Sequence, residues 1–270
     1  MGDLHTQDAD HPEGVWARSL GTSDERRSGE FSSKTRFHEY QAGYDVLRGS
    51  SQNERHYQGV GLSYTQGKGS YLGGYSDVTG WGLGLYDTHV RRDGQYLDFA
   101  IKGTHLEGEL HGAYSHGENL DNNGYTLGAE YGYKKPFGQG WFVEPQAQLT
   151  LGWLSGADMD LRNGVHYHED DIRSAVGRAG LRLGYAGDTA QFFLKADWFH
   201  EFGGSSRLHL SDDEGQLHLD EDYGDNWFEY GLGLTANLTK NSQLYADFEK
   251  SNTGAYHKKW GWDAGVRWTF

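Results

Sequence analysis

Hydrophobic and polar residues alternate strictly at the end of the chain. Reading back from Phe270, the even positions are apolar: Trp268, Val266, Ala264, Trp262 and Trp260. The odd positions hold Thr, Arg, Gly, Asp, Gly and Lys. Because successive side chains of a strand point to opposite faces, this pattern predicts a strand over 259–270. One of its faces is aromatic-rich, and the other is polar or bare.

The same period-2 alternation recurs along the whole sequence. In 226–238, for example, Phe228, Tyr230, Leu232 and Leu234 alternate with charged, small or polar residues. About twelve strands are predicted, an even number as bacterial single-chain barrels require. They lie near 14–21, 36–48, 55–66, 78–90, 95–106, 122–133, 141–154, 173–186, 190–202, 226–238, 242–250 and 259–270.

Short and long connections between these strands alternate. The short reversals include Asp93-Gly94, Gly138-Gln139-Gly140, Gly187-Asp188 and Lys240-Asn241. Longer polar connections are expected near 22–35, 67–77, 108–121, 156–172, 203–225 and 251–258. In outer-membrane barrels the short turns are periplasmic and the long loops are external. Both ends of the predicted barrel therefore lie on the periplasmic side.

Composition agrees with a barrel that spans a membrane through half-apolar strands. The 270 residues include 41 Gly, 3 Pro and no Cys, and no apolar run approaches the ~18 residues of a membrane helix. A net charge of −15 argues against a nucleic-acid partner, which needs clustered Lys and Arg. The N-terminus shows no signal peptide, so an exported form would be a fragment or a processed chain.

A soluble barrel is the alternative to a membrane barrel, because the alternation alone does not say which face is inside. Glycines share one face with the charges, where a packed soluble core needs apolar bulk. Aromatic residues gather near strand ends on the other face, as membrane girdles do. We therefore expect an all-β fold, a transmembrane antiparallel up-and-down β-barrel of about 12 strands in the outer membrane.

Several stretches resemble one protein family. The most specific is 140–149, Gly-Trp-Phe-Val-Glu-Pro-Gln-Ala-Gln-Leu, and others are 14–18, 40–45, 162–164 and 177–184. The chain is similar to the C-terminal translocator domain of autotransporters, nearest the pertactin-like group. This resemblance implies a barrel at 14–270 and a remnant of the linker or lumen helix at 1–13.

The C-terminus resembles the assembly signal of this family. That pattern is a polar residue, Gly and two alternating aromatics, and it is filled here by Asp263, Gly265, Trp268 and Phe270. The resemblance implies recognition by the barrel assembly machinery. An unpaired terminal strand is physically able to add to another sheet edge. These residues also close the barrel against the first strand.

The resemblance also implies the other partners. The family exports an N-terminal passenger, carried in cis, to the cell surface by type V secretion. Outer-membrane lipid and lipopolysaccharide are expected around the barrel, and the domain is expected to be monomeric.

The polar face predicts a set of lumen-lining residues: Glu144, Gln146, Gln148, Lys195, Asp197, Glu229, Asp247, Glu249, Asp263 and Arg267. Polar inward residues suit a water-filled lumen. Some autotransporters use lumen acids to cleave their own linker. We expect a pore wall of ion pairs and no catalysis.

Catalytic and metal motifs are weak. The sequence contains no Gly-x-Ser-x-Gly elbow and no His-Glu-x-x-His motif, and no cofactor is expected. The best metal candidate is His166 and His168 with Glu169, Asp170 and Asp171. A solvated loop is the preferred interpretation, so no metal site is predicted.

Two other functions remain as alternatives. A lipase or protease built on a barrel would need a rim triad, for which only His105, His111 and Ser115 stand out, in a segment interpreted as a loop. A diffusion porin would show steady conductance through an unplugged lumen. A long β-helical repeat preceding Met1 would favour the translocator.

Overall fold

The computed structural model describes residues 13–28, 31–71, 73–112, 115–161, 163–251 and 253–270. Within these residues the chain forms one 17-stranded sheet. The strands are β1 (Glu13–Ser28), β2 (Phe31–Ser50), β3 (Glu54–Tyr71), β4 (Gly74–Arg91), β5 (Gln95–Gly112), β6 (Ser115–Tyr133), β7 (Lys135–Phe137), β8 (Trp141–Leu154), β9 (Ala157–Asp160), β10 (His166–Glu169), β11 (Ile172–Ala186), β12 (Ala190–Glu201), β13 (Ser205–Ser211), β14 (Gln216–Asp222), β15 (Asp225–Thr239), β16 (Ser242–Ser251) and β17 (Tyr256–Thr269). The expected helix remnant at 1–13 lies outside the described residues, except for Glu13, which begins β1.

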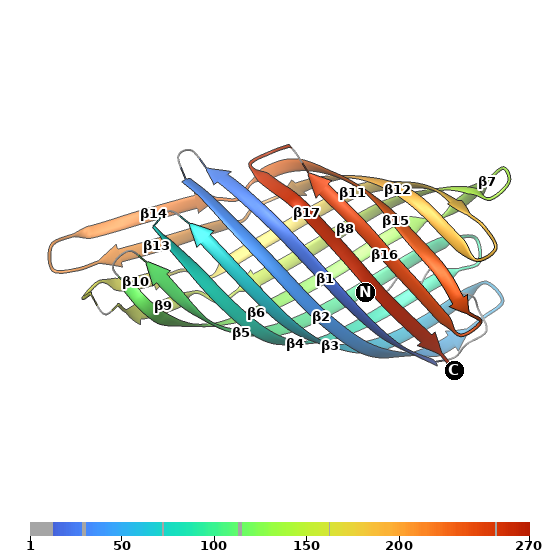
Figure 1. Cartoon of the computed structure of the whole chain (residues 1–270), viewed down its shortest axis with the longest axis horizontal. Helices are drawn as coiled ribbons and strands as arrows, with labels where there is room; N and C mark the ends of the chain where they lie inside the picture. Colours follow the sequence, from blue (N-terminus) through green and yellow to red (C-terminus); the bar gives the residue numbers. More distant parts are fainter. Residues whose placement is uncertain (1–12, 29–30, 72, 113–114, 162, 252) are drawn as a thin grey trace.

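The sheet closes on itself. The first strand, β1, pairs antiparallel with both β2 and β17, so the first and last strands of the described chain meet at one seam (Figure 1). Four long strands are each interrupted by a few residues, giving the pairs β8–β9, β10–β11, β12–β13 and β14–β15. The short β7 pairs only with the start of β8. The described residues thus form a closed antiparallel barrel of twelve strands, which confirms the predicted fold class.

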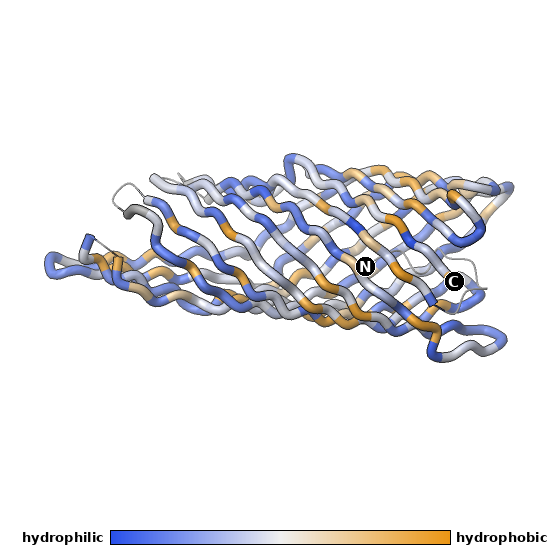
Figure 2. Tube along the Cα trace, turned by 60° about the horizontal axis from the view of Figure 1, so that its bottom comes forward, coloured by the Kyte–Doolittle hydropathy of each residue, from blue (hydrophilic) through white to orange (hydrophobic). Residues whose placement is uncertain are grey.

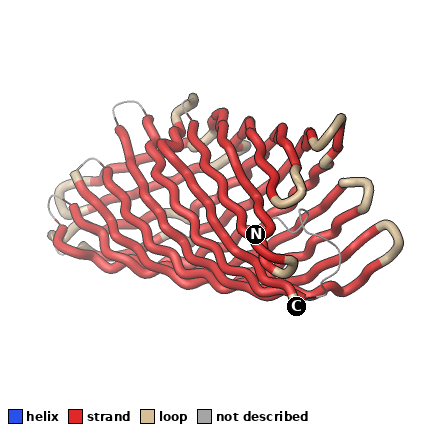
Figure 3. The backbone as a smooth tube through the Cα atoms, turned by 45° about the vertical axis from the view of Figure 1, so that its right-hand side comes forward, coloured by secondary structure: helices blue, strands red, loops and turns tan. Residues whose placement is uncertain are grey.

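Strands extend much further than the alternation predicted. Where a connection was expected at 22–35, β1 continues to Ser28 and β2 begins at Phe31. The predicted loop at 203–225 contains the hairpin β13–β14, which projects beyond the barrel (Figure 1). Strands make up nearly all of the described chain, with short loops between them (Figure 3). Beyond the lipid both faces are wet, so the alternation fades. The backbone groups still need partners, and the strand ladder continues.

The outer face is apolar across the middle of the barrel. Val60, Leu85, Ile101, Leu127 and Leu151 lie opposite one another on five consecutive barrel strands. Each is between 39% and 56% exposed. Hydrophobic residues are dense toward the end that carries the C-terminus, whereas the opposite rim is mostly hydrophilic (Figure 2). A continuous exposed apolar belt fits lipid and is incompatible with a soluble barrel.

The alternation predicts that Trp198, Leu234, Phe248 and Trp262 face lipid. In the structure Leu234 lies opposite the exposed Phe192, and Trp262 lies opposite Phe248. Trp198 and Phe248 are 47% and 45% exposed, whereas Leu234 and Trp262 are half-buried. Trp262 is covered because its ring packs beside His38. No helix in the described part of the chain is long and apolar enough to cross a membrane.

Inside the barrel, buried aromatic rings lie over glycines. Each ring belongs to one strand, and the glycine directly opposite it belongs to the neighbouring strand. A Cβ atom at any of these glycines would overlap the ring. The pairs are Trp16 with Gly43, Tyr86 with Gly59, Tyr96 with Gly132, Phe142 with Gly184, Phe193 with Gly233, and Tyr245 with Gly265. Each of the six hairpins that make up the barrel contains one such pair.

Candidate functional site: the charged lumen

Contacts that skip a strand identify the inner face of the barrel. Lys195 on β12 contacts Glu249 on β16 at 2.7 Å, across the intervening β15. Lys258 on β17 contacts Glu229 on β15 at 2.7 Å, across β16. Side chains two strands apart converge only on the concave side of a curved sheet. These charged groups therefore lie inside the barrel.

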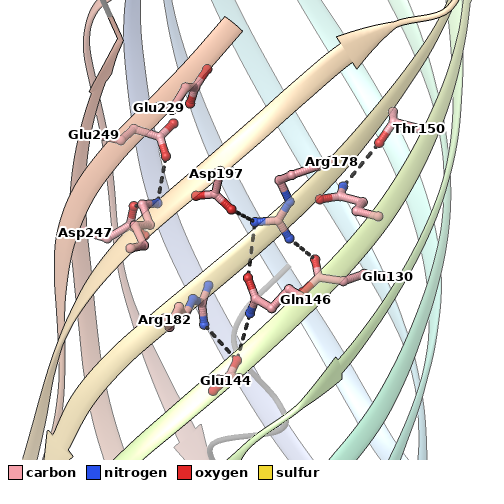
Figure 4. A network of polar contacts seen from close by, with 12 residues as sticks. Glu130, Glu144, Gln146, Thr150, Arg178, Arg182, Asp197, Glu229, Asp247 and Glu249 are labelled. Atoms are coloured by element: carbon pink, nitrogen blue, oxygen red, sulfur yellow. Dashed lines mark hydrogen bonds and ion pairs between the residues drawn. The ribbon is translucent and has the colours of Figure 1, made fainter. Parts of the chain in front are cut away.

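Arg178 is the centre of one lumen network (Figure 4). Its guanidinium lies 2.9 Å from Glu130 and 3.0 Å from Asp197, and it donates to the Gln146 side chain at 3.3 Å. These four residues come from β6, β8, β11 and β12. One planar guanidinium with several donors thus ties four strands together.

Glu144 continues this network toward the end of the barrel that carries the short turns. It is 1% exposed and accepts hydrogen bonds from Gln146 at 2.7 Å and Tyr96 at 3.2 Å. Arg182 lies 3.5 Å from the same carboxylate. Gln148, the next inward residue of β8, donates to Thr150 at 3.2 Å. A buried carboxylate is stable only with such partners, so these contacts hold the wall together.

A second cluster surrounds two lysines. The Lys195 ammonium lies 2.6 Å from Asp247, in addition to its contact with Glu249. Lys258 contacts Glu249 as well as Glu229. Here two lysines are matched by three carboxylates over β12, β15, β16 and β17, which leaves the wall locally acidic.

A third cluster lies at the seam between the first and last strands. Arg267 forms a two-pronged ion pair with Asp45, which is completely buried. Tyr86 donates to Asp45 at 2.8 Å and accepts from the Trp16 indole at 2.7 Å. Nearby, Arg18 lies 3.2 Å from Asp263. The seam is thus reinforced by contacts among β1, β2, β4 and β17.

The sequence predicted some of the charged residues in these clusters and missed most of their ion-pair partners. The missed partners are Arg18, Asp45, Glu130, Arg178, Arg182 and Lys258. The signal for five of them was present, because each is a charged residue on the glycine-bearing face of its strand. Lys258 is an even position, which the alternation assigns to the aromatic face, and the register shift opposite Ser23 and Asp24 brings it to the inner face. Partner choice depends on the closed register, which the alternation does not encode.

A cavity of about 440 Å³ lies within the lumen. The wall formed by β3, β4 and β6 contributes Gly61, Gly84 and Gly128, and at Gly128 no atom lies within 4 Å of where a Cβ would be. Arg182 and Glu130 belong to the same lining. Open lumen space therefore lies beside Gly128, while Lys102 on β5 and Glu130 on β6 contribute charges to the same lining.

The residues considered for a hydrolase triad do not form one. His105 lies in strand β5, within the strand predicted at 95–106. His111 also lies in β5 and Ser115 begins β6, so the loop expected over 108–121 is wrong at these two residues. The ring of His105 contacts Asn123 at 3.1 Å, whereas His111 stacks on Tyr75. The two histidines thus have separate partners.

The five residues of the metal candidate also have different partners. His166 and His168 lie on strand β10, not in a loop, and contact Asp160 at 2.9 Å and Asp158 at 2.8 Å. The hydrogen bond that His168 donates to Asp158 raises the pKa of His168. Asp170 lies 3.4 Å from His168.

The remaining two carboxylates face other groups. Glu169 accepts from Tyr167 at 3.0 Å, and Asp171 accepts from the Trp153 indole at 3.1 Å. The five residues therefore do not converge on one point.

The C-terminal residues divide between the two faces of β17. Trp268 and Phe270 are 47% and 60% exposed on the outer face. Asp263 contacts Arg18 inside, and Gly265 lies under the Tyr245 ring. The Phe270 amide donates to the Glu13 carbonyl at 3.2 Å, so the tail contacts the first strand.

A closed twelve-stranded barrel with an apolar exterior and a charged lumen is an outer-membrane β-barrel. The chain belongs to the autotransporter β-domain family, whose model matches residues 15–249. It is the translocator domain of an autotransporter, located in the outer membrane.

The pertactin autotransporter of Bordetella parapertussis is 28% identical over 272 residues, covering 95% of this chain and 28% of that protein. The probable autotransporter YcgV of Escherichia coli is 27% identical over 271 residues, covering 93% of this chain and 27% of that protein. The chain thus spans little more than a quarter of these relatives.

Solved structures of autotransporter domains have a similar fold. The β-domain of the Bordetella autotransporter BrkA matches with a TM-score of 0.80 and 25% identity, covering 96% of this chain and 100% of that one. The translocator domain of NalP from Neisseria meningitidis matches with a TM-score of 0.73 and 17% identity, covering 98% of this chain and 90% of that one.

Proposed function

We propose that this barrel anchors a passenger joined in cis before Glu13 and exports it through the lumen. The observation that carries the proposal is the lumen itself, which is lined by polar and charged side chains and has open space beside Gly128. Glu13 lies at the rim that carries the short turns, so a segment preceding it enters from that side. A hydrated, ion-paired wall suits passage of an extended chain whose own polar groups need solvation.

In this proposal the domain has no catalytic role. The lumen acids are engaged by Arg and Lys, as Glu144 is by Arg182 and Asp247 by Lys195. Such pairing favours a structural wall over a general acid or base. A surface hydrolase gains no support from His105 and His111, which have separate partners. A porin would conduct ions without exporting a passenger.

Filling the open lumen space beside Gly128 is the test of export. Gly128→Trp in the full-length protein fills open lumen space, and we expect surface-exposed passenger to fall several-fold while the barrel still folds. Passenger is measured by protease accessibility in intact cells, and folding by heat-modifiable gel migration. Gly103→Trp, on the outer face of the adjacent strand beside Tyr125, is the matched control. Equal export by both variants would contradict passage of the passenger through the space beside Gly128.

We further propose that the barrel assembly machinery reads the C-terminal tail. Deleting Phe270 is expected to slow membrane insertion in cells and to change refolding in detergent much less. In detergent only one exposed aromatic contact of ~1–3 kcal/mol is lost. Folded barrel is quantified in cell envelopes and in detergent, wild type beside the deletion. Parallel defects in both settings would leave Phe270 with a structural role alone.

Lipid and lipopolysaccharide are the proposed surroundings of a monomeric barrel. The exposed apolar belt supports contact with lipid tails. Further toward the hydrophilic rim, Arg36 lies directly opposite Lys68 on the outer face. Asp77 on β4 contacts Lys68 at 2.9 Å, and the exposed guanidinium of Arg36 beside this pair is a group that binds phosphates such as those of lipopolysaccharide. Retention of lipopolysaccharide by the purified barrel is the measurement.

A further inference from the structure

A cluster of two histidines and two carboxylates lies on the outer face of the barrel, at the rim with the short turns. His56 on β3 and His89 on β4 are directly opposite each other in register. Their rings stack with centroids 4.3 Å apart and planes 12° apart. Asp87 precedes His89 by two residues and shares its face, and Glu54 precedes His56 by two. Neither the alternation nor any motif identified this cluster.

The ring nitrogens converge on one carboxylate. His56 Nε2 lies 2.9 Å from Asp87 Oδ2, and His89 Nε2 lies 2.9 Å from Asp87 Oδ1. One ligand atom from each of the three residues lies within 4.8 Å of the others. Two imidazole nitrogens and a carboxylate are the donor set of three-ligand zinc sites.

Glu54 orients one of these ligands. Its Oε1 lies 2.6 Å from His89 Nδ1, the nitrogen that faces away from Asp87. A carboxylate on the far nitrogen fixes the proton there and leaves the Nε2 lone pair free to bind metal. Gln58 donates to Asp87 Oδ2 at 2.8 Å and so holds the shared carboxylate. His89 and Asp87 thus have outer-shell partners of the kind that metal sites use.

The nitrogen–oxygen contacts with Asp87 are hydrogen bonds as long as no ion is bound. His56 Nε2 and His89 Nε2 each lie 2.9 Å from a carboxylate oxygen, and an N–H proton joins such a pair. A divalent ion displaces these protons and links the same three groups through one centre.

We propose that His56, Asp87 and His89 bind a divalent transition-metal ion, zinc foremost, with Glu54 as a positioning residue. Imidazole nitrogens favour such ions over Ca²⁺ and Mg²⁺, which take oxygen ligands. The three ligand side chains are 28–35% exposed, so water completes the coordination. The ion would tie the periplasmic ends of β3 and β4 together. This site is independent of passenger export.

The test is Zn²⁺ titration of the tag-free, full-length chain folded in detergent, followed by calorimetry, with Ca²⁺ and Mg²⁺ as comparison ions. We expect one zinc site whose affinity falls at least tenfold in His56→Ala and in His89→Ala. In Glu54→Gln the affinity should fall about 10–100-fold, as for other outer-shell partners. His166→Ala removes a histidine paired with an aspartate outside the cluster and should leave the affinity unchanged.

Cobalt substitution supplies a readout that a folding defect does not imitate. Co²⁺ bound to the wild-type chain should give visible absorption bands of a low-coordinate nitrogen and oxygen site, absent in His89→Ala. Heat-modifiable migration shows that each variant is folded. Zinc affinity unchanged in both histidine variants, or Ca²⁺ bound as tightly as Zn²⁺, would overturn the proposal.

Discussion

Replacing Leu127 with arginine is expected to prevent most of the barrel from folding into lipid bilayers. Leu127 is 50% exposed and lies between Ile101 and Leu151, in the middle of the outer apolar belt. A guanidinium at the bilayer midplane costs about 2–4 kcal/mol on a barrel exterior. That is a large part of the stability of an ordinary domain. The folded fraction is measured by heat-modifiable migration after refolding into vesicles across a urea series.

The neighbouring residue supplies the control for this prediction. Gly128 follows Leu127 on the same strand but faces the lumen, where no atom lies within 4 Å of its Cβ position. Gly128→Arg introduces the same guanidinium into water near Glu130, so the urea midpoint should shift far less. Similar losses in the two variants would mean that the faces of β6 are not lipid and lumen, contrary to the exposure of the belt.

The sequence predicted the barrel because the alternation is a local signal. The strand at 259–270 illustrates this: its period-2 pattern is visible in the residues themselves and needs no knowledge of neighbours. Short turns at Asp93-Gly94 and Gly138-Gln139-Gly140 were equally local, and Gly94, Gly138 and Gly140 have the positive φ that such turns favour. Strand count and closure followed from these signals.

Strand length and side-chain partners could not be predicted in the same way. The segment 22–35 carries no hydropathy alternation, yet β1 and β2 continue through most of it because their backbones pair with each other. Arg178 lies between residues from three other strands, and which carboxylates it meets depends on the shear of the closed barrel. The zinc candidate was missed for the same reason: His56 and His89 are 33 positions apart in sequence and meet only through the β3–β4 register.

Replacing Gly59 with valine is expected to destabilise the barrel and its seam together. Any Cβ at Gly59 overlaps the ring of Tyr86, whose hydroxyl joins Trp16 to the buried Asp45. Overpacking costs about 1–3 kcal/mol. Displacing the Tyr86 hydroxyl from a buried carboxylate adds about 1–3 kcal/mol. The combined loss should appear as a lower urea midpoint of the folded barrel and as quenched or shifted Trp fluorescence, because Trp16 loses its partner.

A double-mutant cycle separates this contact from a general effect of adding side chains. Gly49→Ala, on the neighbouring β2 with no atom within 4 Å of its Cβ position, should leave the midpoint nearly unchanged. Gly59→Ala and Tyr86→Ala should each be destabilising, and their combination should cost less than the sum, because removing the ring removes the overlap. Additive losses would show that Gly59 is needed for some other reason. Non-additive losses would show that the ring packed over the opposite glycine holds neighbouring strands in register. Five more such pairs recur around the barrel.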